Sequence, residues 1–201
     1  MGHPAEKLRP ATYADLEAVP PHQVAEIIEG TLYAFPRPAP KHANASSALG
    51  MKLGPPFQFG EGGPGGWWIV DEPELRLTGD VLVPDLAGWR VERLPELPET
   101  AYFSVAPDWI CEVLSPSTAG IDRVKKMPVY AREGVRHVWL IDPNERTLEV
   151  FRLGADGHWQ VIGLYDEAAK VRAEPFGAIE IDLMRLWQKP APPAPPATPS
   201  P

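Results

Sequence analysis

Two acidic residues stand out because the segments around them are apolar. Asp85 follows Pro84 in the run VLVPDLAGW, and Glu112 lies in the middle of the run WICEVL. An ionised carboxylate in such surroundings is costly unless it has a charge partner or a metal ion. Carboxylates from two adjacent strands, with a backbone carbonyl between them, form the oxygen-rich site that hard divalent cations prefer. The pair therefore predicts a site for Mg²⁺ or Mn²⁺.

Each carboxylate also has a simpler interpretation. Asp85 suits a turn at the end of its strand, and Glu112 suits an outward-facing strand position, although Glu112 shares its face with two apolar neighbours. Zinc fits the site less well, because the only cysteine, Cys111, is in mid-strand and the histidines show no ligand spacing. We expect all five histidines to be surface or packing residues: His3, His22, His42, His137 and His158.

A basic segment follows Glu112. Residues 119–137 contain five basic and two acidic side chains, a net charge of +3, in a chain whose overall net charge is −8. The overall charge argues against broad non-specific binding of nucleic acid, because that affinity comes from basic surface. Any contact with phosphate is therefore expected at this local positive segment.

The basic segment has the pattern of a helix over about 122–133. Asp122, Lys126 and Tyr130 are spaced at i, i+4 and i+8 and share one polar face. A solvated amphipathic helix is the simpler interpretation of the same pattern. Pro128 removes one helical hydrogen bond and disfavours helical geometry at the preceding residue, so we expect a late start or a kink. The opposite, apolar face is predicted to consist of Val124, Met127, Pro128 and Ala131.

The elements that must position these residues are short strands. The runs over 108–114 and 137–141 are apolar on both faces, as central strands covered by helices tend to be. Joined through the helix, they form a β-α-β unit with a parallel pair of strands. The sequence therefore predicts an α/β or α+β domain with a mixed central sheet. Further strands are expected at 67–70, 74–77, 81–89, 147–152 and 158–163, a hairpin turn at Glu29-Gly30, and helices near 12–19, 42–53 and 183–187.

Composition is that of one ordinary globular domain, with 201 residues, 44% hydrophobic and 23% charged. The last twelve residues hold seven of the 26 prolines and no charge. We predict an N-terminal extension over 1–11, one domain over 12–187 and a disordered Pro-rich tail over 188–201. A single cysteine permits no intrachain disulfide, and no run approaches the ~18 apolar residues of a membrane helix. We therefore expect a cytoplasmic protein without membrane contact.

In their order along the chain these features resemble a known family. Pro84-Asp85 at a strand end, the apolar strand with Glu112, and the pattern SPST-x3-D-x3-K-x3-Y-x3-G ending in VWLIDP are similar to the Uma-two-type endonucleases. That family belongs to the PD-(D/E)XK, or restriction endonuclease-like, superfamily. The similarity runs over about 12–187 and is most specific over 108–143. It implies a restriction endonuclease-like fold, with a mixed central sheet flanked by helices.

The resemblance also implies roles for single residues. Asp85 and Glu112 would bind the divalent ion, and Glu26, in the segment AEIIEG, would be a further acidic residue near the site. The superfamily has a lysine two positions after the glutamate, where this sequence has Leu114. Lys126, on the following helix, is the candidate for a displaced lysine.

The hypothesis that follows is metal-assisted hydrolysis of phosphodiester bonds in DNA. Asp85, Glu112 and the carbonyl of Val113 would hold one or two Mg²⁺ or Mn²⁺ ions, which polarise the phosphate and lower the pKa of a water toward ~7. Lys126 would orient that water or stabilise charge on the phosphoryl oxygens. Because cutting two strands often needs two active sites, we expect a homodimer. Supporting roles are predicted for Asp122, which would hold Lys126, for the basic Lys125, and for Ser115, Ser117 and Thr118, which would donate hydrogen bonds to phosphates.

Three other functions stay open. The missing near lysine also suits a nuclease-like fold that binds nucleic acid or a protein without cutting. The seven tryptophans and the Pro-rich tail suit a protein-interaction module, although tryptophans in strands usually pack in the core. Paired carboxylates also hydrolyse glycosides, but a basic helix beside them suits phosphate better than a neutral sugar. The sequence does not specify a target or choose between DNA and RNA.

Overall fold

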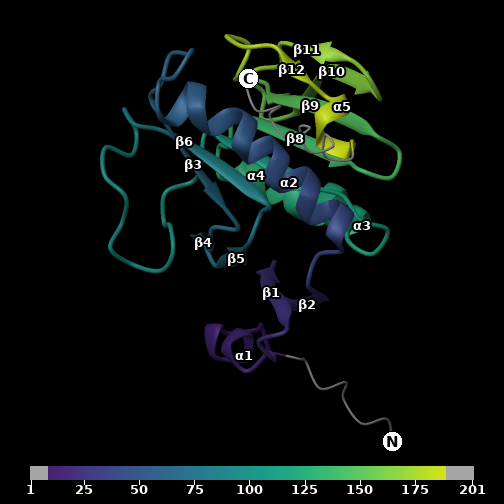
Figure 1. Ribbon diagram of the computed structural model, residues 1–201. Helices are drawn as coiled ribbons and strands as arrows, with labels where there is room; N and C mark the ends of the chain where they lie inside the picture. Colours follow the sequence, from purple (N-terminus) through teal and green to yellow (C-terminus); the bar gives the residue numbers. More distant parts are fainter. Residues whose placement is uncertain (1–8, 189–201) are drawn as a thin grey trace, which may run out of the picture.

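A computed structural model of the chain describes residues 9–188 (Figure 1). Most of the predicted N-terminal extension and nearly all of the predicted tail lie outside the described residues. The helices are α1 (Tyr13–Glu17), α2 (Pro40–Leu53), α3 (Ala119–Ile121), α4 (Met127–Arg132) and α5 (Met184–Trp187), with π-helical turns at Gly54–Gln58 and Asp122–Lys126. The strands are β1 (Gln23–Ile28), β2 (Thr31–Pro36), β3 (Trp67–Asp71), β4 (Leu75–Leu77), β5 (Asp80–Leu82), β6 (Leu86–Arg90), β7 (Trp109–Val113), β8 (His137–Asp142), β9 (Thr147–Leu153), β10 (Trp159–Asp166), β11 (Lys170–Val171) and β12 (Ile181–Asp182).

The central element is a six-stranded sheet in the order β10-β9-β8-β7-β6-β3. Strands β7 and β8 are parallel, with Glu112 beside Leu140, and the other neighbours in the sheet are antiparallel. A parallel pair needs a long crossover, and the segment with α3 and α4 provides it. The predicted mixed sheet with a central β-α-β unit is confirmed.

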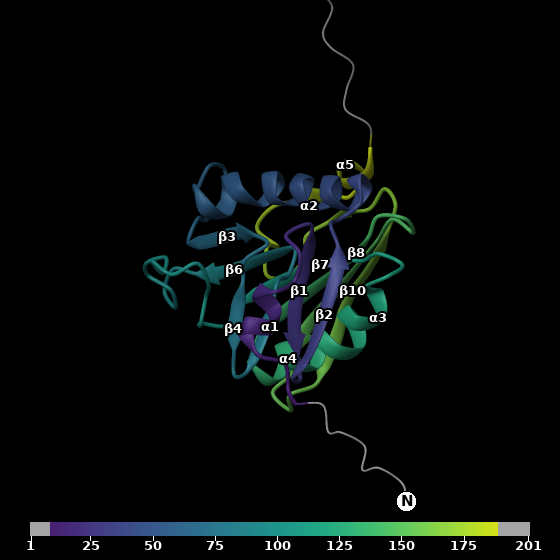
Figure 2. The same ribbon diagram turned by 90° about the horizontal axis from the view of Figure 1, so that it is seen from below.

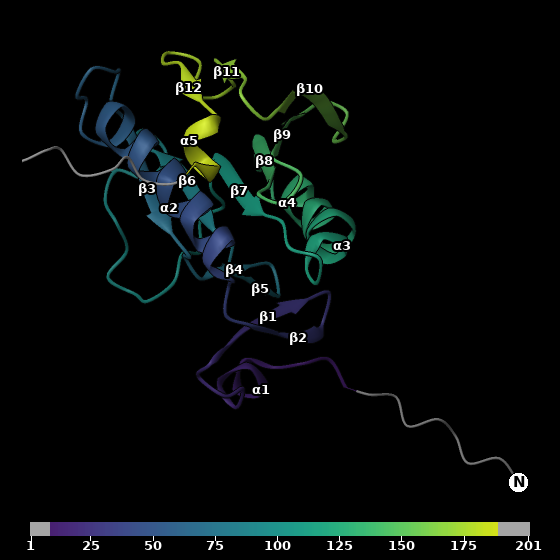
Figure 3. The same ribbon diagram turned by 45° about the vertical axis from the view of Figure 1, so that its right-hand side comes forward.

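Helices cover both faces of this sheet. Figure 3 shows β7 and β8 between α2 on one side and α3 and α4 on the other, and Figure 2 shows the same layers from below. Side chains alternate along β7, so Trp109, Cys111 and Val113 pack with α2, while Ile110 and Leu114 join the cluster that includes α4. Glu112, which lies between Ile110 and Leu114 in this alternation, therefore faces the α4 side.

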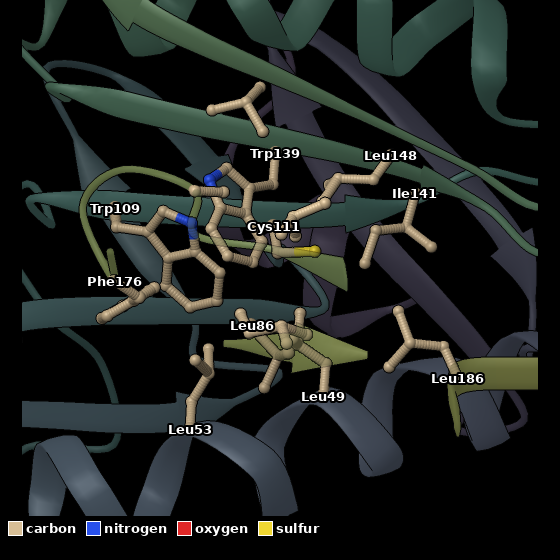
Figure 4. Close-up of a cluster of buried hydrophobic side chains, with 14 of the residues drawn as sticks. Leu49, Leu53, Leu86, Trp109, Cys111, Trp139, Ile141, Leu148, Phe176 and Leu186 are labelled. Atoms are coloured by element: carbon tan, nitrogen blue, oxygen red, sulfur yellow. The ribbon is translucent and has the colours of Figure 1, made fainter. Parts of the chain in front are cut away.

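The core on the α2 side is built around aromatic rings. Phe176 lies 4.9 Å from Trp109 and 5.7 Å from Trp139 between ring centroids, and both pairs are edge-on. Figure 4 shows Leu49 and Leu53 projecting from α2 toward Leu86 and the other labelled side chains of this cluster. Four of the tryptophans, at 67, 89, 109 and 139, are buried. Their burial agrees with the core role expected for tryptophans in strands.

A smaller sheet, in the order β2-β1-β5-β4, lies against one end of the central sheet. Its hairpin turns at Glu29 and Gly30, whose φ angles of 51° and 75° are those of a two-residue turn with left-handed residues, as predicted. The run 81–89, expected as one strand, is instead divided between β5 of this sheet and β6 of the central sheet. Pro84 lies in the break, because it has no N–H to donate to a sheet.

The helical crossover differs from the prediction in two ways. It begins at Ala119, before the expected start, and passes through a π-helical turn in which the N–H of Met127 bonds to the carbonyl of Asp122. This wider turn accommodates Pro128, which lacks an N–H. The predicted apolar face is wrong in part, because Val124 and Pro128 are exposed, whereas Asp122, Lys126 and Tyr130 are buried. The polar face points inward because Lys126 contacts the carboxylates of Glu26 and Glu112 there.

Across the part of the chain that is described, no helix combines the length and the apolar character needed to cross a membrane.

Candidate active site

Asp85 and Glu112 lie at the same end of two adjacent strands. Leu86 pairs with Cys111 in the antiparallel register of β6 and β7, so Asp85, one residue earlier, continues that register toward Glu112. A carboxylate oxygen of Asp85, Oδ2, accepts a 2.7 Å hydrogen bond from the backbone N–H of Val113. The structure therefore brings together the two carboxylates that the sequence singles out, with Val113 between them.

Lys126 is buried among carboxylates from three elements. Its Nζ lies 2.9 Å from Glu26 Oε1 on β1, 3.3 Å from Glu112 Oε1 on β7, and 3.4 Å from Asp122 Oδ1 one turn earlier in its own helix. Only 6% of the lysine side chain is exposed. Burial alone would lower the pKa of Lys126, but the carboxylates of Glu112, Glu26 and Asp122 together raise it well above its usual value. The three carboxylates therefore favour the charged form of the ammonium group.

Glu112 has a second partner on the same helix face. The hydroxyl of Tyr130 donates a hydrogen bond to Glu112 Oε1, the oxygen that also contacts Lys126. Glu26 is fixed independently, because its Oε1 accepts a 2.7 Å hydrogen bond from the N–H of Val83. Asp122, Lys126 and Tyr130 thus use the predicted i, i+4, i+8 spacing to hold the inner carboxylates.

Acidic side chains outnumber basic ones in this cluster. Four acidic side chains, Glu26, Asp85, Glu112 and Asp122, surround the single ammonium group of Lys126. Burial raises the pKa of Asp85 to about 7 and that of Glu112 well above its usual range, although Lys126 acts in the opposite direction on both. A low-dielectric site with surplus carboxylates is one that a cation stabilises.

The chemistry of the donors fits a hard divalent ion. Asp85 and Glu112 offer carboxylate oxygens and Val113 offers a carbonyl, which are the donors that Mg²⁺ and Mn²⁺ accept. Within residues 9–188, however, no three His, Cys, Asp or Glu side chains converge so as to hold an ion by themselves. Any ion here would complete its shell with carbonyl, water or substrate oxygens, as magnesium usually does.

A pocket of about 270 Å³ opens onto the cluster. Ser115 and its neighbours form one wall, where the hydroxyl of Ser115 lies 3.0 Å from those of Ser117 and Thr118. Lys125 is not part of the lining, because it is one residue round the helix from Lys126 and its Nζ lies 3.4 Å from Glu29 Oε2. Every other predicted site residue borders the pocket: Glu26, Asp85, Glu112, Val113, Ser115, Ser117, Thr118, Asp122 and Lys126.

The same pocket contains residues that sequence reasoning missed. The imidazole of His42, in the first turn of α2, has its Nε2 3.4 Å from Asp85 Oδ1, although we expected a surface or packing residue. Burial lowers the pKa of His42, and the Val113 carbonyl partly opposes this. Glu72 lies at a strained φ of 42°, and its N–H donates to the carbonyl of Asp85. Arg37 Nη1 lies 3.8 Å from Glu72 Oε2 at the pocket wall.

Comparison with known proteins places this architecture in a class. A crystal structure of "a putative nuclease belonging to DUF820 from Anabaena variabilis ATCC 29413" is similar in fold, with a TM-score of 0.71 and 24% sequence identity. The similarity covers 89% of this chain and 98% of that one. The chain therefore shares the mixed α+β fold of that protein, as expected from the sequence. No curated protein matches the sequence.

The family follows from a second comparison. Residues 10–184 match the model of the Uma2 family, which is described as "Putative restriction endonuclease". The chain belongs to this family, and the resemblance seen in the motifs around Asp85, Glu112 and Lys126 is confirmed.

Proposed function

We propose that this protein is a divalent-metal-dependent endonuclease that hydrolyses phosphodiester bonds of DNA in the pocket around Asp85, Glu112 and Lys126. One observation carries the proposal: a buried lysine contacts the carboxylate of Glu112 at 3.3 Å, beside Asp85, in an open pocket. Membership of the Uma2 family supports it.

Asp85, Glu112 and the Val113 carbonyl are the groups that would hold the ion, as Mg²⁺ or Mn²⁺. When bound, such an ion supplies the Lewis acidity that polarises a phosphate and makes a water molecule acidic enough to attack near neutral pH. The carboxylates are already fixed for this task, because the N–H of Val113 holds Asp85 and the hydroxyl of Tyr130 holds Glu112. Preorganised partners of this kind reduce the cost of binding an ion.

Lys126 provides the positive charge of the site. Its ammonium group is held by Glu26 and Asp122 beside Glu112, so it can stabilise negative charge on the phosphoryl oxygens without reorganisation. At position 114, where the superfamily has its lysine, Leu114 is 2% exposed and packs in the apolar cluster near Tyr130. The positive charge beside Glu112 therefore comes from Lys126 on the helix and not from a lysine at position 114.

The pocket wall offers contacts for the phosphate backbone. Ser115, Ser117 and Thr118 bring three hydroxyl groups together, and the first turn of α2, with Ala39 and His42, borders the same space. Hydroxyl groups and the N-terminal ends of helices both favour phosphate. Arg37 adds a partly exposed cation at the wall.

The test is nicking of supercoiled plasmid DNA with Mg²⁺ or Mn²⁺, with and without EDTA. We expect cleavage by the unaltered protein, and a loss of at least about a hundredfold in Asp85→Asn and Glu112→Gln. Glu149→Gln is the matched control, because Glu149 is a glutamate of the same sheet that pairs with Arg123 outside the pocket. Equal rates for all four proteins would show that the proposed site is wrong.

A binding module that does not cleave is the second candidate. One observation favours it: in the part of the chain that is described, no three metal-binding side chains converge on an ion site. Affinity for DNA that is independent of divalent ions, with no nicking at any ion concentration, would establish this role. The expected homodimer and cytoplasmic location stay predictions.

A further inference from the structure

His42 has a largely buried imidazole whose hydrogen bonds are incomplete. Its side chain is 12% exposed, yet its Nδ1 has no hydrogen-bond partner in the described structure. Its Nε2 lies 3.4 Å from Asp85 Oδ1. At 3.4 Å this contact is longer than an ordinary hydrogen bond, so Nε2 lies beside the Asp85 carboxylate without being tightly bound to it.

Its surroundings differ from those of the other buried polar groups at the site. Glu26 contacts Lys126 and accepts a hydrogen bond from the N–H of Val83, and Tyr130 donates a hydrogen bond to Glu112. His42 instead faces the two groups assigned to the ion, the Asp85 carboxylate and the Val113 carbonyl. An imidazole turned toward two oxygen donors is placed as a third donor to whatever those oxygens bind.

We propose that His42 is a nitrogen ligand of the divalent ion, bound beside Asp85. This inference rests on the metal site of the proposed function and adds one residue to it. Because no three His, Cys, Asp or Glu side chains already converge within residues 9–188, His42, Asp85 and Glu112 would close around the ion as it binds. Neighbouring donors of a six-coordinate ion with bonds of ~2.1 Å are about 3.0 Å apart, so the 3.4 Å between Nε2 and Oδ1 requires only a small adjustment. The helix position also suits this role, because the fixed start of α2 after Pro38 and Ala39 borders the pocket.

A nitrogen ligand changes which ion the site prefers. Carboxylate, carbonyl and water oxygens suit Mg²⁺, whereas an imidazole favours transition-metal ions. With His42 in the shell, Mn²⁺ binds more tightly than Mg²⁺. With a shell of oxygen donors alone, the difference between the two ions is smaller.

The experiment is calorimetric titration of the full chain with Mn²⁺ and, separately, with Mg²⁺, which measures binding without any substrate. The proteins are the unaltered chain, His42→Gln, Asp85→Asn and, as a control, His158→Gln at an exposed histidine. We expect His42→Gln to weaken Mn²⁺ binding by about tenfold or more while changing Mg²⁺ binding by less than about threefold. Thermal melting without ions shows whether each variant is folded.

Each other outcome has a definite meaning. If His42→Gln binds Mn²⁺ as the unaltered chain does and Asp85→Asn does not, His42 is not a ligand, and the proposed site stands without it. If His42→Gln weakens both ions by the same factor, the histidine acts only by positioning Asp85, and the inference is overturned. If the unaltered chain binds neither ion at millimolar concentration, the metal site itself is wrong, whatever the nicking assay shows.

Discussion

Lys126 reaches Glu112 from the helix that follows the glutamate's own strand. The two side chains are 3.3 Å apart and almost fully buried, although fourteen positions separate them in the sequence. Tyr130, one turn further along, bonds to the same carboxylate oxygen. Because both partners come from one inward helix face, the lysine and the tyrosine hold Glu112 as a unit.

Replacing Lys126 by methionine is expected to lower stability and cleavage together. The change leaves Glu26, Glu112 and Asp122 buried without their cation, which costs about 3–5 kcal/mol when one member of a buried ion pair is removed. Urea unfolding at pH 8 measures this loss. Lys170→Met, at an exposed lysine of β11, should stay within about 0.5 kcal/mol of the unaltered protein. A neutral effect of Lys126→Met would contradict the buried network.

Tyr130→Phe removes only the hydroxyl that donates to Glu112. Loss of a buried hydrogen bond to a carboxylate is expected to lower the free energy of unfolding by about 1–3 kcal/mol and to weaken divalent-ion binding by about tenfold. The comparison variant is Tyr33→Phe on β2, outside the pocket. Unchanged ion affinity in Tyr130→Phe would mean that the hydroxyl does not prepare Glu112 for an ion.

Removal of divalent ions is expected to lower the melting temperature. An ion that binds only the folded chain stabilises it by about 2.7 kcal/mol at a hundred times its dissociation constant, which corresponds to roughly 5–10 °C for a domain of this size. Scanning calorimetry with Mn²⁺ and then with EDTA measures the shift. The shift should disappear in Asp85→Asn, and its persistence there would place the ion elsewhere.

Protonation of His137 is expected to change the stability of the protein with pH, independently of the candidate active site. Burial lowers its pKa from the ordinary value of 6.5, although Glu174, 3.2 Å away, opposes this, and Arg152 and Arg90 act in the same direction as burial. The unfolded chain therefore takes up this proton first as the pH falls. Stability should decline below pH 6.5 and down through the lower folded pKa. Urea unfolding between pH 8 and 5 should show a shallower decline in His137→Gln, and identical slopes would refute this explanation.

Much of the site could be predicted because its residues contradict their surroundings. Asp85 directly precedes an apolar strand and Glu112 lies within one, and Lys126 keeps a helical spacing to Asp122 through the π-helical turn. The β-α-β unit was readable because both of its strands are apolar on two faces. Each of these patterns lies within a short stretch of sequence, and each is present in the structure.

Other parts depend on contacts that local patterns do not contain. His42 meets Asp85 because α2 packs across the sheet through Ala45, Leu49 and Leu53, more than thirty positions before β6, the strand that follows Asp85. The inward turn of the polar helix face depends on Glu26, which comes from the small sheet. The break in 81–89 likewise depends on pairing with distant strands, because β5 pairs with β1 and β4 in the small sheet whereas β6 pairs with β7 and β3 in the central sheet.

The central claim is that Glu112 takes part in cleavage rather than in binding of DNA. Its most direct test compares Glu112→Gln with the unaltered protein in two measurements on one supercoiled plasmid with Mn²⁺: the rate of nicking and the affinity for the DNA. We expect nicking to fall by at least about a hundredfold while the affinity for DNA changes by less than about threefold. Nicking by Glu112→Gln at the unaltered rate would contradict it.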